Sequence, residues 1–98
     1  MKIQLRLLIW GQAKECLDRA IRDDSVPLYT EAFQLAEKAL QHYPRDPEIH
    51  FILGIAKLKA WGNREYAWSK QRLLMGLHSQ EAMEFAKRLQ KEILAAGG

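Results

Sequence analysis

The fold of this chain is decided by residues 29–44, which read YTEAFQLAEKALQHYP. The apolar residues of this stretch recur at spacings of three and four, which is the period of an α-helix with one buried face. Three of them, Ala32, Ala36 and Ala39, have small side chains that let a second helix approach closely. Pro44 cannot continue a helix, so the helix ends shortly before it. The stretch therefore predicts an amphipathic helix that packs tightly against a neighbour.

The helical period extends to both sides of this stretch. Ser25 and Asp46 stand one or two residues before a proline, an arrangement typical of a helix start with a polar N-cap. Residues 3–9 also show an apolar alternation that would suit a strand, but the helical pattern there continues much further. We predict five helices, at about residues 3–23, 27–42, 47–60, 64–75 and 80–95. Helices joined by such short loops pack antiparallel, so we expect a single all-α domain over residues 1–98.

The composition excludes several classes of protein. A chain of 98 residues is long enough for one domain and too short for a catalytic domain with a regulatory one. No run reaches the roughly 18 consecutive apolar residues of a membrane-spanning helix, so we expect no membrane partner. The single cysteine excludes a disulfide framework and a paired-cysteine zinc site, and a cytoplasmic location is the expectation that follows.

The net charge of +3 is unevenly distributed. Residues 1–48 hold seven Lys or Arg against eight Asp or Glu, which gives −1. Residues 49–98 hold eight against four, which gives +4. This asymmetry favours an acidic partner for the second half of the chain.

The sequence does not collect the groups that an enzyme needs. Cys16 lies near Glu15 and Asp18, two carboxylates that raise the pKa of a thiol instead of activating it. The three histidines fall on separate segments, and there is no glycine-rich phosphate loop. We therefore expect no enzymatic activity, no metal site and no cofactor.

Residues 29–48 resemble the second helix and the linker of a tetratricopeptide repeat, because their three alanines and Pro44 fall at the family's intervals. Leu53 and Gly54 then resemble the Leu-Gly pair of the following first helix, where the glycine permits a tight helix crossing. The resemblance covers residues 29–76, about one and a half repeats. It implies a repeat-like core over 27–76, flanked by an atypical first helix and a capping helix over 80–95. His50 and Lys57 depart from the pattern, since the family has aromatic residues at those positions.

The resemblance implies a protein-interaction module, such as an adaptor or a small chaperone. In this family the first helix of each repeat lines a concave face that grips a peptide. Carried over residue by residue, the partner-binding residues would be Glu48, Phe51, Ile55, Leu58 and Lys59. The three apolar members suit a helical or extended apolar segment of a partner protein. Two other possibilities stay open: the helices over 3–23 or 80–95 cover these residues, or a second copy covers them in a homodimer.

An alternative hypothesis is that the chain binds nucleic acid through another face. Aromatic and cationic residues alternate across the helices at 47–60 and 64–75, a pattern that suits base stacking and phosphate contact. The residues of this alternative face are Lys57, Trp61, Arg64, Trp68, Lys70 and Arg72. A solvated basic surface with tryptophans that pack the two helices explains the same pattern, and we favour that interpretation.

Overall fold

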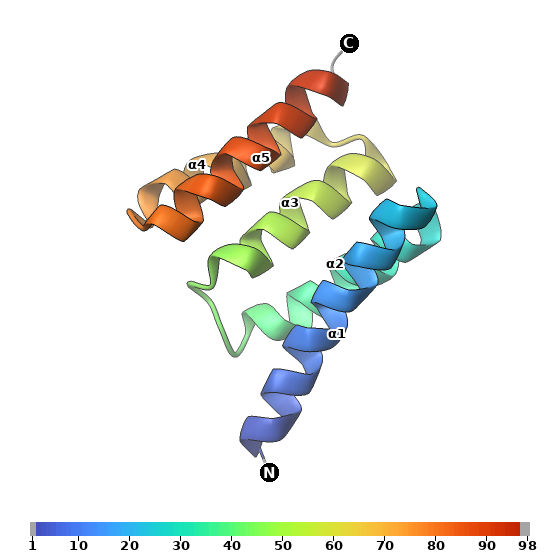
Figure 1. The fold of residues 1–98 in the computed structure, drawn as a ribbon, viewed down its shortest axis with the longest axis vertical. Helices are drawn as coiled ribbons and strands as arrows, with labels where there is room; N and C mark the ends of the chain where they lie inside the picture. Colours follow the sequence, from blue (N-terminus) through green and yellow to red (C-terminus); the bar gives the residue numbers. More distant parts are fainter. Residues whose placement is uncertain (1, 97–98) are drawn as a thin grey trace.

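The computed structural model describes the backbone of residues 2–96 and the side chains of residues 8–96. The described chain consists of five α-helices, which confirms the all-α prediction (Figure 1). They are α1 (Lys2–Asp23), α2 (Val26–Leu40), α3 (Pro47–Trp61), α4 (Arg64–Gly76) and α5 (Gln80–Ala96). Across residues 2–96, no helix combines the length and apolar character that crossing a membrane requires.

The helix starts form where the sequence predicts them. Ser25, Asp46 and Asn63 are the N-caps of α2, α3 and α4, and each side chain accepts a hydrogen bond from a first-turn backbone N–H. At this position the cap satisfies a donor that has no partner within the helix. The alternating apolar residues near the N-terminus lie in α1, so the longer helical period prevails there over the strand-like one.

The helix ends agree less closely with the sequence. Gly62 ends α3 in the left-handed conformation, with φ of 65°. The helix expected at 64–75 runs one residue further, so Gly76 lies inside α4 and does not end it in the left-handed conformation. The left-handed backbone conformation comes two residues later, at His78, with φ of 56°. The backbone N–H groups of Leu77 and His78 still bond carbonyls three residues back, at 3.2 and 3.4 Å, so a tightened last turn delays the change of direction.

The five helices form two layers (Figure 1). Helices α1, α3 and α5 lie side by side, while α2 lies behind α1 and α4 lies behind α5. Helix α2 contacts α1 and α3, and α4 contacts α3 and α5. Helix α3 is central and contacts all four others. Its buried residues cover every side of the helix, and they are Ile49, His50, Phe51, Ile52, Leu53, Gly54, Ile55, Ala56 and Leu58. The other four helices therefore enclose α3 between Ile49 and Leu58.

Gly54 allows α3 to approach its neighbours closely. A Cβ atom at this position would lie 2.7 Å from Cδ2 of Leu89 on α5 and 3.2 Å from Cβ of Lys70 on α4. Leu89 is fully buried, so its side chain has little space into which to move. The tight crossing that we expected at this glycine is confirmed.

Candidate functional site

The candidate site is a concave region between α1 and α5, the two outer helices of the α1–α3–α5 layer. In the described chain α1 and α5 each contact α3 but do not contact one another. A cavity of about 420 Å³ opens between them, with α3 beneath. This volume falls in the range of roughly 300–1,000 Å³ that is usual for ligand sites. The residues that line it are Ile21, Asp24, Tyr29, Phe51, Ile55, Lys59, Arg88, Lys91 and Glu92.

The floor of the cavity is apolar and firmly packed. Phe51 and Ile55 of α3 are 3% and 2% exposed, and Tyr29 of α2 is also buried. The Phe51 ring packs against Phe85 of α5 with a centroid distance of 5.0 Å. Burial raises the pKa of the Tyr29 phenol, while the nearby charge of Lys59 acts in the opposite direction. The floor therefore offers a rigid surface to an incoming apolar group.

The wall on the α5 side is mainly basic. Nζ of Lys59 forms an ion pair with Oε1 of Glu92 at 3.1 Å, which joins α3 to α5. The guanidinium of Arg88 lies over the Phe51 ring, 4.6 Å from its centroid. Lys91, three residues after Arg88 on α5, is exposed. Asp24, at the end of α1, contributes an acidic group to the opposite side.

Three of the five predicted partner-binding residues meet in this cavity, and two do not. Phe51, Ile55 and Lys59 line it. Leu58 is 3% exposed and packs in the core, away from the cavity. Because all three apolar members are buried, α3 presents no open apolar stripe, and the cavity is the accessible part of the predicted groove.

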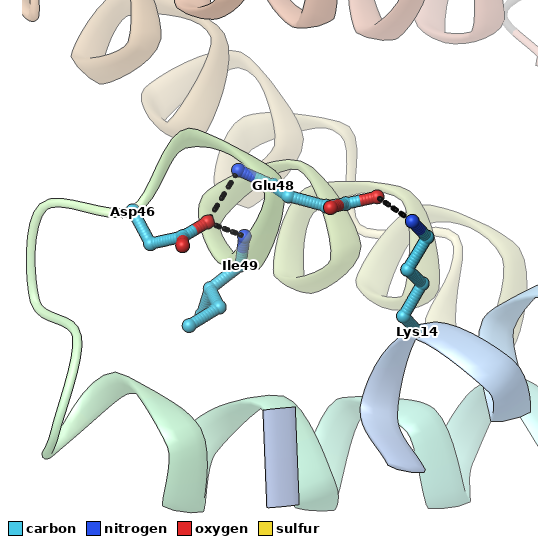
Figure 2. A network of polar contacts seen from close by, with 4 residues as sticks. All are labelled: Lys14, Asp46, Glu48 and Ile49. Carbon is cyan, nitrogen blue, oxygen red and sulfur yellow. Dashed lines mark hydrogen bonds and ion pairs between the residues drawn. The ribbon is translucent and has the colours of Figure 1, made fainter. Parts of the chain in front are cut away.

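Glu48 has a different environment from the one we expected. Its Oε2 atom lies 3.9 Å from Nζ of Lys14, so the pair bridges α3 and α1 (Figure 2). The backbone N–H groups of Glu48 and Ile49 donate to Oδ1 of Asp46, the N-cap of the same helix. Partial burial raises the pKa of the Glu48 carboxyl, and the charge of Lys14 opposes that change. Glu48 thus pairs with a residue of α1 and does not line the cavity.

Sequence reasoning missed the contribution of α1 and α5 to this site. Arg88 and Lys91 are three residues apart on α5, and this spacing places them on the same side of the helix. The spacing of Arg88 and Lys91 was the sequence signal for this part of the site, but by itself it indicates only that one side of the helix is basic. Which residues face them depends on how α5 crosses α3.

The six residues of the alternative nucleic-acid face do not form one open surface. Nζ of Lys57 lies inside a group of three rings, 4.8 Å from the centroid of Phe33, 4.5 Å from Trp61 and 5.4 Å from Tyr66. We call Lys57 and these three rings the lysine cage. Trp61 closes it from outside and is 49% exposed.

Lys70, a second cation of that face, also points inward. Its Nζ atom lies 3.2 Å from Nδ1 of His50, and Trp68 is half-buried on the same helix. Arg64 and Arg72 are exposed. The basic charge that solvent can reach on this face is therefore smaller than the sequence suggests.

Within the described residues, no three His, Cys, Asp or Glu side chains are grouped to hold a metal ion. Comparison of this chain with family models, curated proteins and solved structures finds no match. The site is therefore interpreted from its own residues.

Proposed function

We propose that this chain is a protein-interaction module of tetratricopeptide-repeat-like architecture. It binds a partner protein by taking a large apolar side chain of a short segment into the cavity between α1, α3 and α5. One observation carries the proposal: α1 and α5 stand apart across α3 and leave a cavity of about 420 Å³ with an apolar floor. The chain then acts as an adaptor or a small chaperone.

Three features support this function. In the family that residues 29–76 resemble, the first helix of a repeat lines the binding face; α3 has that place in the resemblance, and it forms the floor of the cavity. Gly54 makes the close crossing for which that family uses its glycine. The floor residues Phe51 and Ile55 are held by the core, so binding does not require them to be ordered first.

The dimensions of the cavity favour a short segment over a long docked helix. Between Ile49 and Leu58 the apolar residues of α3 are at most 3% exposed, so a long apolar face would find little surface to cover. A single anchor side chain that is fully buried contributes about 1.5–3 kcal/mol. Exposed Ile21, at the rim, extends the apolar contact beyond the floor. One anchor with a few rim contacts is therefore the binding mode that fits best.

The experiment is selection of a random twelve-residue peptide library on the immobilised protein. We expect the enriched peptides to share a large apolar residue. Their affinities are then measured for the unmodified protein, for Ile21→Asp at the cavity rim, and for Val26→Asp as a matched control. Both substitutions replace an exposed β-branched residue, 47% and 52% exposed, but only Ile21 lines the cavity.

We expect Ile21→Asp to weaken binding at least about tenfold, because it puts a charge where the apolar anchor enters. Val26→Asp should change the affinity less than about twofold. Circular dichroism should give the same helical signal for both variants. The proposal fails if no peptide is enriched, or if both variants weaken binding equally.

A further inference from the structure

We propose that the cavity selects segments in which an acidic residue lies next to the large apolar anchor. The carboxylate is held by Arg88 and Lys91 on α5 while the anchor fills the space above Phe51 and Ile55. This inference rests on the proposed function and names the chemistry of the partner. The partner is a protein with an acidic, apolar recognition segment.

Arg88 is positioned to receive a carboxylate. Its guanidinium lies over the rings of Phe51 and Phe85, with centroid distances of 4.6 and 5.7 Å. Contact with a ring occupies the face of a guanidinium and leaves its in-plane N–H donors free. These donors match the two oxygens of a carboxylate. The ring that forms the cavity floor thus also orients the donor group at the cavity lip.

Of the three cations of this wall, Lys59 is neutralised by an ion pair, and Arg88 and Lys91 have none among the described residues. Lys59 is paired with Glu92 at 3.1 Å. Among residues 8–96, neither Arg88 nor Lys91 has a carboxylate within 4.0 Å. A carboxylate from a partner would meet two cations that form no ion pair within 4.0 Å in the described chain, since Glu92, which lines the same cavity, is paired with Lys59. Charge complementarity therefore favours an acidic segment.

The two sides of the cavity differ in charge, and this difference sets the orientation of the segment. Asp24 lies on the α1 side with the apolar rim residue Ile21. A carboxylate there would be repelled, whereas on the α5 side it would meet Arg88 and Lys91. The acidic residue should therefore lie toward α5 and the rest of the segment toward α1.

The apolar floor argues for a peptide over a nucleic acid. A phosphate backbone could use the basic wall, but it carries no side chain to fill the space above Phe51 and Ile55. An acidic residue beside an apolar one uses both parts of the cavity at once. The asymmetry in net charge along the chain agrees with an acidic partner as well.

The test uses the same peptide library and then a double-mutant cycle. We expect Asp or Glu to be enriched within two positions of the apolar anchor. One such peptide is compared with its Asp→Asn or Glu→Gln version on the unmodified protein and on Arg88→Gln, Lys91→Gln and Lys87→Gln. Lys87 is the matched control, because it is exposed on α5 but does not line the cavity.

Neutralising the acid should weaken binding to the unmodified protein at least about tenfold, the usual size of a charged hydrogen bond. The same change in the peptide should have less than about a threefold effect on Arg88→Gln. On Lys91→Gln, neutralising the peptide acid should also weaken binding less than it does on the unmodified protein. On Lys87→Gln, it should weaken binding as much as on the unmodified protein. The affinity of the acidic peptide should also fall as salt is raised.

The outcomes separate this inference from the proposed function. Peptides that share an apolar anchor without acidic residues, and that lose binding to Ile21→Asp but not to Arg88→Gln, would overturn the inference and leave the function intact. Failure to enrich any peptide would overturn both. If a heparin oligosaccharide displaced the peptide as effectively as its own acidic competitor, the basic wall would be a general polyanion surface and the inference would be wrong.

Discussion

Nζ of Lys70 lies 3.2 Å from Nδ1 of His50; the His50 side chain is buried and Lys70 is half-buried. An ammonium has only donors, so Nδ1 of His50 accepts and the ring proton lies on Nε2. Nε2 then donates to the carbonyl of Pro44 at 2.8 Å. The neutral imidazole thus connects α4 to the linker between α2 and α3.

This arrangement predicts that the protein loses stability in mild acid. Burial, and secondarily the charge of Lys70, lower the pKa of His50 from its usual 6.5, although the Pro44 hydrogen bond and Asp46 oppose the change. Because the folded pKa is lower, the unfolded chain takes up the proton first. The stability that neutral His50 contributes to the fold is fully present above about pH 6.5, and it is lost as the pH falls through the folded pKa of His50.

We expect the unfolding free energy to fall by up to about 1.4 kcal/mol per pH unit within this window. Urea denaturation between pH 5 and 8, followed by circular dichroism, measures it. His50→Gln, which keeps a donor and an acceptor but does not titrate, should remove this part of the slope. His42→Gln at an exposed position is the control, and an unchanged slope in His50→Gln would contradict the assignment.

Gly54 and Gly11 should respond in opposite directions to substitution by alanine. Both lie inside helices, where alanine is favoured by about 0.5–1 kcal/mol. At Gly11 no atom lies within 4 Å of the added Cβ, so Gly11→Ala should stabilise the fold by about that amount. At Gly54 the Cβ would overlap Leu89, and overpacking costs about 1–3 kcal/mol. Urea midpoints that rise equally for both variants would disprove a tight crossing.

The helices and their starts were predictable because they depend on neighbouring residues. A cap such as Asp46 contacts N–H groups two and three residues away, so its pattern is visible in the sequence. The end of α4 was not predictable, because Gly76 permits a left-handed turn without requiring one. The local sequence therefore predicts the starts of the helices better than their ends.

The candidate site was only half predictable because it joins residues distant in sequence. Phe51 and Ile55 were identified because the resemblance to a tetratricopeptide repeat implies that they lie on its binding face. Arg88 joins them only because α5 crosses α3 beside Gly54, which no local pattern records. The two departures from the tetratricopeptide pattern, His50 and Lys57, form long-range contacts within the fold, with Lys70 and with the aromatic rings of the lysine cage. Their polar character is thus explained by partners that the sequence does not place.

The lysine cage predicts that the charge of Lys57 stabilises the junction of α2, α3 and α4. Lys57→Met keeps the aliphatic stem and removes only the ammonium. We expect a loss of about 1 kcal/mol, which is typical of a partly desolvated cation–π contact. Lys87→Met, at an exposed position on α5, should change stability by less than about 0.5 kcal/mol. Equal unfolding midpoints for the two variants would mean that the three rings contribute nothing through charge.

Cys16 should be almost unreactive in the folded protein. Burial raises the pKa of its thiol to about 11, and its contact with Glu31, 3.2 Å from Sγ to Oε2, acts in the same direction. The usual value is 9.0, so at pH 8 the folded chain holds about a hundredfold less thiolate than the unfolded chain. Since the thiolate is the nucleophile, alkylation by iodoacetamide should be slower by at least that factor.

The rate is measured by mass spectrometry with and without 6 M guanidinium chloride, and the denatured chain is the internal reference. Glu31→Gln should speed the folded-state reaction, because it removes the carboxylate charge beside the sulfur while keeping an acceptor. The matched control is Glu37→Gln, also exposed on α2 but not in contact with Cys16. Equal rates in folded and denatured protein would show that the thiol is not held between α1 and α2 as described. Faster alkylation in both glutamine variants would instead point to general loosening of the helix pair.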